Sequence, residues 1–280
     1  MENKKILITG GTSGLGKATA LNLAIQGAEV VITARDEYKA NQVVREIIEK
    51  SKNDRVTYFM VDLASMESVR KLARNFKRKH DKINVLINNA GMIYKDRIVT
   101  VDGFEKTLAV NHLSHFLLTH LIMDELISGA PSRIINVSSE AQTQGHIYFD
   151  DIMLSKKYNS FKAYSQSKLA NILFTYRLAE NLKDRKITVN AVHPGAVRTN
   201  FGSTAKPSFK YLIKLFTPLL RPVEKGIETI LYLTVSPEMG NISGQYFYDL
   251  KSIKSNPESY SMEIIEKFWK LSEELCGLNN

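Results

Sequence analysis

Residues 6–16 have the sequence Ile-Leu-Ile-Thr-Gly-Gly-Thr-Ser-Gly-Leu-Gly. The first three residues form a short apolar run, typical of a strand buried on both faces of a parallel sheet. Gly10, Gly14 and Gly16 follow it, around the start of a helix predicted over 15–26. Side chains there would hold a bound pyrophosphate away from the backbone, and the helix start offers free N–H groups to an anion. Taken alone, the pattern also fits a tight strand–helix connection with incidental glycines.

Strand and helix patterns alternate outward from this stretch. Further strands are predicted over 30–32, 56–61, 85–87, 133–137, 187–192 and 245–248. Helices are predicted over 37–50, 65–79, 161–182 and 223–235, and Asp102 with Glu105 predicts a capping box for a long helix toward Ile127. This order indicates a doubly wound (Rossmann-type) α/β fold, with about seven parallel strands and helices on both faces. Its ligands are expected beyond the carboxyl ends of the strands.

The composition is that of an ordinary globular protein. The 280 residues are 44% hydrophobic and 24% charged, and no linker divides them, so one domain over 1–280 is expected. The net charge of +9 is spread over predicted helix faces, which does not favour nucleic-acid binding. The single cysteine, Cys276, and the lack of any long apolar stretch predict a cytoplasmic protein without a membrane span.

The end of the second strand, Thr33-Ala34-Arg35, bears on the choice of dinucleotide. A carboxylate at this point would bind the ribose hydroxyls of NAD, whereas a small residue followed by arginine leaves room for a 2′-phosphate and a guanidinium to bind it. NADP is therefore favoured over NAD, although Asp36 offers a carboxylate nearby. Asp62, after the third strand, is open to two roles: accepting the adenine amino group or starting the cap of the next helix.

Tyr164 and Lys168 lie four residues apart on a predicted helix and so share one face. A tyrosine can exchange a proton with an alcohol or carbonyl oxygen, and a nearby lysine cation favours its phenolate form. Such pairs are common on ordinary helices. This helix, however, follows a strand that ends at Ser138-Ser139, which brings a hydroxyl to the edge where ligands bind.

Together, these motifs resemble the short-chain dehydrogenase/reductase family over roughly residues 4–200. The resemblance rests on the glycine turn, Asn88-Asn89-Ala90-Gly91, Asn111, Ser138-Ser139, the Tyr164/Lys168 pair and Pro194-Gly195. The segments 110–113 (Val-Asn-His-Leu) and 165–171 (Ser-Gln-Ser-Lys-Leu-Ala-Asn) resemble its retinol-dehydrogenase-like branch. Two features depart from the family pattern. The stretch between Ser139 and Tyr164 is longer than in many members, so a loop over 144–157 should cover or flank the pocket. The hydrophobic N-terminal segment of the membrane-anchored members of this branch is not found in this sequence.

The resemblance implies catalytic roles for four residues. Tyr164 would be the general acid/base, and Lys168 would bind the nicotinamide ribose and lower the pKa of the tyrosine. Ser139 would hydrogen-bond the substrate oxygen, and Asn111 would hold a water in a proton relay. The implied cofactor-binding residues line the turns at the strand ends: Gly10, Thr12, Ser13, Gly14, Leu15, Gly16, Arg35, Asp62, Leu63, Asn88, Ala90, Gly91, Tyr164, Lys168, Pro194, Gly195, Val197 and Thr199.

We therefore expect an NADP(H)-dependent oxidoreductase acting on a small carbonyl or alcohol substrate. The segments 92–94 and 209–220 are apolar enough to favour a lipophilic one, and a substrate lid is expected near 200–222, with peripheral membrane contact as the alternative role of that segment. The resemblance also implies a homo-oligomer formed through the helix that carries the tyrosine. The histidines at 112 and 115 lack a convincing third ligand, so no metal site is expected. The rival interpretation is a non-catalytic NADP(H)-sensing regulatory protein.

Overall fold

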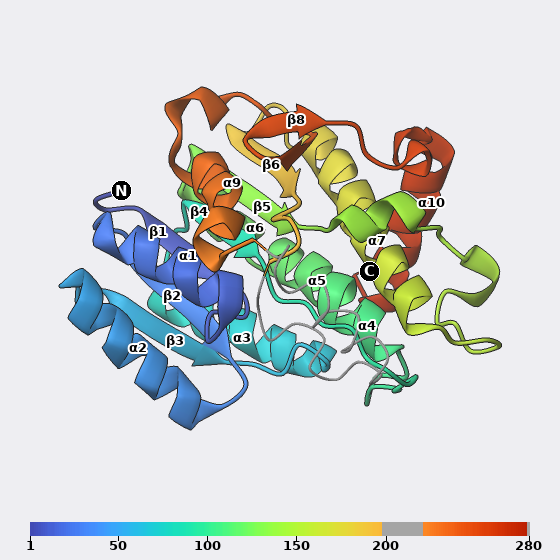
Figure 1. The fold of residues 1–280 in the computed structure, drawn as a ribbon, viewed down its shortest axis with the longest axis horizontal. Helices are drawn as coiled ribbons and strands as arrows, with labels where there is room; N and C mark the ends of the chain where they lie inside the picture. The colour runs from blue at the N-terminus through green and yellow to red at the C-terminus, as the bar shows by residue number, and fades with distance from the viewer. Residues whose placement is uncertain (198–220, 279–280) are drawn as a thin grey trace.

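A computed structural model describes residues 1–197 and 221–278. Its strands form one eight-stranded sheet in the order β3-β2-β1-β4-β5-β6-β7-β8 (Figure 1). The strands are β1 Lys5–Ile8, β2 Glu29–Ala34, β3 Val56–Met60, β4 Val85–Asn88, β5 Ser132–Val137, β6 Ile187–Val192, β7 Gln245–Tyr248 and β8 Lys251–Ile253. Neighbours pair in parallel except β7 and β8, which are antiparallel. The predicted doubly wound fold is confirmed, with the short β8 as a strand that the sequence pattern missed.

Helices cover both faces of this sheet, and the strands divide their side chains between them. Ile6 and Ile8 of β1 belong to a core beneath α1 Gly14–Ile25, α2 Glu37–Ser51 and α9 Val223–Val235. Leu7 between them faces the opposite core, beneath α3 Met66–Lys79, α5 Ser114–Leu121 and α7 Ser160–Asn181. Burial on both faces explains why β1 is a continuous apolar run rather than an alternating one.

The helical region between β4 and β5 corrects one prediction. It consists of α4 Lys106–Leu108, the π-helical turn η1 Ala109–Leu113, α5 and α6 Met123–Ser128. The predicted capping box is wrong, because Glu105 is itself the N-cap and its carboxylate accepts from the backbone N–H groups of Thr107 and Leu108, both at 2.8 Å. Asp102 instead accepts from the N–H of Met66 at 2.9 Å and so joins this loop to the start of α3.

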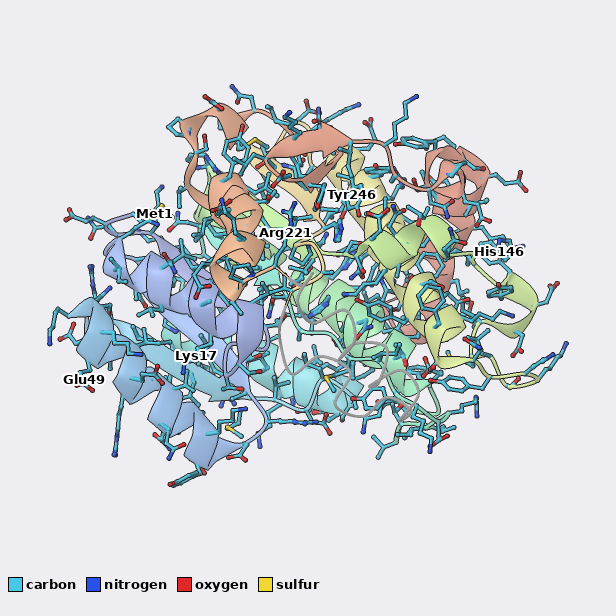
Figure 2. All side chains as sticks on the ribbon, viewed as in Figure 1. Met1, Lys17, Glu49, His146, Arg221 and Tyr246 are labelled. Atoms are coloured by element: carbon cyan, nitrogen blue, oxygen red, sulfur yellow. The ribbon has the colours of Figure 1, made fainter. Side chains whose placement is uncertain are left out.

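The C-terminal region adds a helix that the sequence analysis did not predict. After η5 Pro237–Gly240, β7, β8 and η6 Pro257–Tyr260, the chain forms α10 Met262–Leu275, which packs on α7. Residues 165–175 of α7 are all buried as a result of this packing and that of the sheet. Two short helices, η2 Glu140–Gln144 and η3 Phe149–Asp151, lie in the loop before α7. Glu49 on α2 and His146 after η2 lie at opposite edges of the molecule (Figure 2). Among residues 1–197 and 221–278, no helix has the length and apolar character needed to cross a membrane.

Candidate functional site

A cleft of about 480 Å³ opens at the carboxyl ends of β1, β2, β3 and β4. The strand order changes direction between β1 and β4, and this switch point is where an open α/β sheet binds its ligands. Eleven of the residues predicted to bind a cofactor line the cleft: Gly10, Thr12, Ser13, Gly14, Leu15, Gly16, Arg35, Asp62, Leu63, Ala90 and Gly91. The structure therefore brings together segments that lie up to 80 residues apart in the chain.

The glycine turn of the cleft fits a pyrophosphate. Gly10 and Gly14 have positive φ angles of 69° and 52°, which glycine adopts without strain. A Cβ placed on Gly16 would lie 2.3 Å from the carbonyl oxygen of Gly10, so no side chain can replace its hydrogen. Ser13, the N-cap of α1, makes no side-chain capping hydrogen bond, and the first N–H groups of this helix remain available to an anion.

Two cations, and a carboxylate that already forms a hydrogen bond, lie where the cleft meets the end of β2. Arg35 and Lys39 both line it. Asp36 lines it too, but its Oδ1 accepts from the backbone N–H of Lys39 at 2.9 Å and so caps α2. The carboxylate that could have bound ribose hydroxyls is therefore engaged with its own helix, whereas the two cations would suit a 2′-phosphate.

Asp62 and Asn88 have more specific positions than the sequence indicated. Asp62 is not the cap of α3, since Ser65 takes that role, and its Oδ1 accepts from the N–H of Ala64 at 2.9 Å while the residue lines the cleft. Asn88 is buried, and its Nδ2 donates to Asn136 Oδ1 at 2.8 Å, which ties β4 to β5. The side chain that lines the cleft is that of the next residue, Asn89.

The catalytic candidates lie at the carboxyl end of β5 and on α7. Ser139 lies beside Tyr164, the predicted acid/base, close enough to lower the pKa of its phenol. Ser138, its neighbour, is buried and donates instead to the carbonyl oxygen of Lys168 at 2.8 Å. The two adjacent serines thus have different partners, and Ser139 is the one whose hydroxyl is next to the tyrosine.

Lys168 connects the catalytic group to the cleft. Its Nζ donates to the carbonyl oxygen of Val137 at 2.9 Å and lies 5.7 Å from the centroid of the Tyr164 ring. A Cβ placed on Gly91, which lines the cleft, would lie 3.2 Å from this Nζ and 3.5 Å from Asn111 Oδ1. Gly91 therefore lets the cleft floor approach both residues closely.

Asn111 is held in the π-helical turn η1. Its Oδ1 accepts from the N–H of Met92 at 2.8 Å, and its Nδ2 donates to the Met92 carbonyl and to Ser167 Oγ, both at 2.9 Å. These bonds join three segments: the cleft floor, the π turn and the catalytic helix. Single π turns of this kind are frequent at functional sites.

Burial dominates the titration of the catalytic pair. Burial raises the pKa of Tyr164 to about 12, and the hydrogen bond from Ser139 opposes this increase. Burial also lowers the pKa of Lys168 to about 8. At neutral pH the site therefore holds a protonated tyrosine beside a lysine that is mostly charged.

The segment after β6 approaches the same region. Gly195 has a φ of +84°, and its N–H donates to Nδ1 of His193 at 3.2 Å, just after Pro194 begins the turn. Val197 lies close to Leu15 at the start of α1, since a Cβ on Gly226 would meet Val197 Cγ2 at 2.5 Å and Leu15 Cδ2 at 2.8 Å. Thr199 and the lid expected near 200–222 lie outside the described residues, apart from residues 221 and 222.

The sequence analysis missed several residues of the site. Lys39 and Asn89 line the cleft. Lys39 comes four positions after the predicted Arg35, and Asn89 comes directly after the predicted Asn88. A helical spacing from Arg35 could have indicated Lys39, because residues four apart share a helix face. Met92 and Tyr94, expected in the substrate pocket, also line this cleft. Within the described residues, no group of three His, Cys, Asp or Glu side chains could hold a metal ion.

Comparisons with known proteins identify the family that this chain matches. A family model described as short chain dehydrogenase matches residues 4–208. Human (Homo sapiens) retinol dehydrogenase 13 is 40% identical over 281 residues, which cover 98% of this chain and 85% of that protein.

Two solved structures are also similar. An uncharacterized protein from Mycobacterium paratuberculosis has a TM-score of 0.80 and 29% identity, over 99% of this chain and 94% of that one. A short chain dehydrogenase from Burkholderia cenocepacia J2315, in complex with NADP, has a TM-score of 0.70 and 26% identity, over 88% and 96%. The family match includes both the glycine turn and the catalytic helix.

Proposed function

The chain belongs to the short chain dehydrogenase family of oxidoreductases, and from that premise we propose that it is an NADP(H)-dependent alcohol dehydrogenase or carbonyl reductase. In the proposed reaction a hydride passes between the nicotinamide and the carbon of a carbonyl or alcohol, while Tyr164 transfers the proton. The observation that carries the proposal is the position of Ser139 and Lys168 beside Tyr164, next to the glycine-lined cleft.

Each part of a dinucleotide has a matching group of residues in or beside the cleft. The glycine turn and the start of α1 would bind the pyrophosphate. Asp62 and Leu63 would border the adenine, with Asn89 to Gly91 behind its ribose. Lys168, with Pro194, Gly195, Val197 and Thr199, would hold the nicotinamide half. When bound, the nicotinamide supplies or accepts the hydride, and its oxidised form adds a positive charge near the phenol.

The preference for NADP rests on Arg35 and Lys39. Both cations line the cleft, whereas the nearby carboxylate of Asp36 caps α2. A 2′-phosphate would gain charge-assisted hydrogen bonds here that the ribose hydroxyl of NAD cannot form. The similar dehydrogenase from Burkholderia cenocepacia was solved with NADP, which supports the same assignment.

Tyr164 and Ser139 would do the proton chemistry. In the direction of carbonyl reduction, the tyrosine begins protonated, donates its proton to the forming alkoxide, and shares the stabilisation of that oxygen with the serine hydroxyl. In the direction of alcohol oxidation, it must first ionise. With a pKa of about 12, ionisation at pH 7 costs roughly 7 kcal/mol before any help from a bound cofactor. The ligand-free protein therefore holds the protonated tyrosine that the reduction step uses. Asn111 would hold the relay water that returns a proton to the tyrosine through Lys168.

The proposed substrate is a lipophilic aldehyde, ketone or secondary alcohol. Met92 and Tyr94 line the cleft, and Ile93 between them is 2% exposed. Relatives that are about 40% identical bear the name retinol dehydrogenase, which also supports a lipophilic alcohol or aldehyde. Residues 165–175 of α7 are buried within one chain, and a homo-oligomer formed through this helix stays a prediction. A cytoplasmic location stays a prediction from the composition.

The proposal is tested by NADPH oxidation, with NADH in parallel, against a panel of lipophilic aldehydes and ketones. Turnover with NADPH is expected, and Tyr164→Phe should lower it by at least about a hundredfold. Tyr232→Phe is the matched control, since Tyr232 on α9 is partly buried and its hydroxyl donates to Glu238 at 2.9 Å.

The cofactor preference is tested in the same assay. Arg35→Ala should weaken NADPH binding about 10- to 100-fold and leave NADH binding unchanged, because only NADPH carries the 2′-phosphate. Arg45→Ala, exposed on α2, is the control. Tight NADPH binding without turnover on any compound of the panel would instead favour the NADP(H)-sensing regulatory protein.

A further inference from the structure

The C-terminal segment 255–258 holds the loop that carries Ser139. We propose that Asn256 is a positioning residue of the active site: by binding the carbonyl groups at the end of η2, it fixes the orientation of Ser139 toward Tyr164. This inference rests on the proposed function. Residues 255–258 lie outside the part of the chain that the family model matches.

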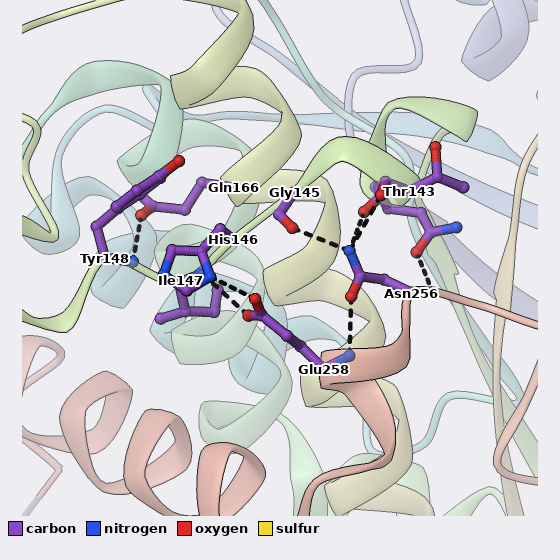
Figure 3. Close-up of polar contacts among 9 residues, drawn as sticks. Thr143, Gly145, His146, Ile147, Tyr148, Gln166, Asn256 and Glu258 are labelled. Atoms are coloured by element: carbon purple, nitrogen blue, oxygen red, sulfur yellow. Dashed lines mark hydrogen bonds and ion pairs between the residues drawn. The ribbon is translucent and has the colours of Figure 1, made fainter.

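Asn256 contacts the η2 loop through its side-chain amide and its backbone N–H (Figure 3). Its Nδ2 donates to the carbonyl oxygens of Gln142 at 3.0 Å, Thr143 at 3.3 Å and Gly145 at 2.9 Å. Its backbone N–H donates to Gln142 Oε1 at 2.8 Å, and its Oδ1 accepts from the N–H of Glu258 at 2.8 Å. Asn256, Gln142 and Gly145 are buried, so the carbonyl groups of Gln142 and Gly145 have little access to water as an alternative partner, whereas Thr143 is exposed.

The short helix η2 ends in carbonyl groups that point toward Asn256. Ser139 is its N-cap, and Ser139 Oγ accepts from the N–H of Ala141 at 3.3 Å. At the end of this five-residue 3₁₀ helix the N–H of Gly145 donates to the carbonyl oxygen of Gln142 at 2.9 Å, and Asn256 donates to that oxygen and to the carbonyl oxygens of Thr143 and Gly145. Movement at this end of η2 would be transmitted to Ser139 only a few residues away.

The opposite side of η2 lies against the catalytic helix. A Cβ placed on Gly145 would lie 2.7 Å from the carbonyl oxygen of Ser165, the residue after Tyr164. The 255–258 segment is in turn anchored to the same helix, since Tyr176 OH hydrogen-bonds to Ser255 Oγ at 2.7 Å. The loop of Ser139 thus lies between α7 and the 255–258 segment, which is itself hydrogen-bonded to α7.

Glu258 extends the contact to the outer part of the loop. Its Oε1 forms an ion pair with Nδ1 of His146, and its Oε2 accepts from the N–H of Ile147 at 3.4 Å (Figure 3). His146 is exposed, so this ion pair contributes little by itself. The buried amide of Asn256 is therefore the part of the contact on which Ser139 depends.

The test compares Asn256→Ala and Asn256→Asp with wild type. Both variants remove the donor to the three carbonyl groups, but Asn256→Asp retains the oxygen that caps Glu258. We expect both to lower kcat about 10- to 30-fold, since small displacements of a catalytic group are costly, with KM for NADPH within about twofold of wild type. Amide hydrogen exchange of residues 139–148 should become faster in both.

Asn53→Ala is the matched control, since Asn53 Nδ2 donates to the carbonyl oxygens of Ala24 at 2.9 Å and Ala28 at 2.8 Å far from the site. It should retain the wild-type kcat. A wild-type kcat in Asn256→Ala, or a kcat retained by Asn256→Asp alone, would overturn the positioning role of the amide and leave the proposed function intact. Absence of turnover in wild type would overturn the proposed function and this inference with it.

Discussion

The order in which Lys168 and Tyr164 lose their protons decides whether the lysine can assist the tyrosine in the ligand-free protein. Burial sets the pKa of the lysine at about 8 and that of the tyrosine at about 12, a difference of about four units. At 5.7 Å from the ring centroid, and with an effective dielectric constant of about 20, a lysine cation would stabilise the phenolate by roughly 3 kcal/mol, or about two units. The form with a lysine cation and a phenolate is therefore still about two pKa units less favourable than the form in which both groups are neutral. It accounts for only about 1% of the molecules that have lost one of the two protons.

We therefore predict that Lys168→Met changes the pKa of Tyr164 by less than about half a unit in the ligand-free protein, because the lysine is already neutral when the tyrosine ionises. The measurement is the phenolate absorbance of each protein minus that of the same protein carrying Tyr164→Phe. Wild type should show no step from Tyr164 below about pH 11.

Ser139→Ala is the control that shows the assay responds. It removes a hydrogen bond that lowers the pKa of Tyr164, so the tyrosine should become harder to ionise. A wild-type step centred below about pH 10 that Lys168→Met moves up by about two units would refute the reasoning. It would mean that the lysine keeps its charge beside the phenolate.

Two further predictions concern the turn and the buried histidines. Gly16→Ala places a Cβ 2.3 Å from a backbone oxygen, so NADPH binding by calorimetry should weaken at least about tenfold, whereas Gly240→Ala, with open space around it, should bind normally. Burial lowers the pKa of His112 to about 4 and of His115 to about 3, both below the value of the unfolded chain. The unfolded chain therefore binds more protons below about pH 6.5, and at pH 5 each histidine should lower the free energy of unfolding in urea by roughly 2 kcal/mol. An unchanged pH dependence in His115→Gln would contradict this.

The local pattern of the sequence determined the main elements of the sheet and the residues around the glycine turn. The predicted strand over 187–192 and the predicted helix over 223–235 match β6 and α9 residue for residue. Gly27, which follows the helix predicted over 15–26, has a φ of +80° just after α1 ends. These features depend on apolar periodicity and on backbone conformations that only certain residues adopt, and both are properties of neighbouring residues.

Contacts between distant segments decided the rest. Glu105 became a helix cap in place of the predicted Asp102 because Asp102 binds the start of α3, 36 residues earlier. Asn256 meets Gln142 across 114 residues of chain, and nothing in the sequence around either residue indicates this pairing. Which of two adjacent residues faces a ligand, as with Asn88 and Asn89, depends on the partners that the folded sheet supplies. Such choices follow from the burial and hydrogen bonding of whole segments, which exist only once the sheet and its covering helices have assembled.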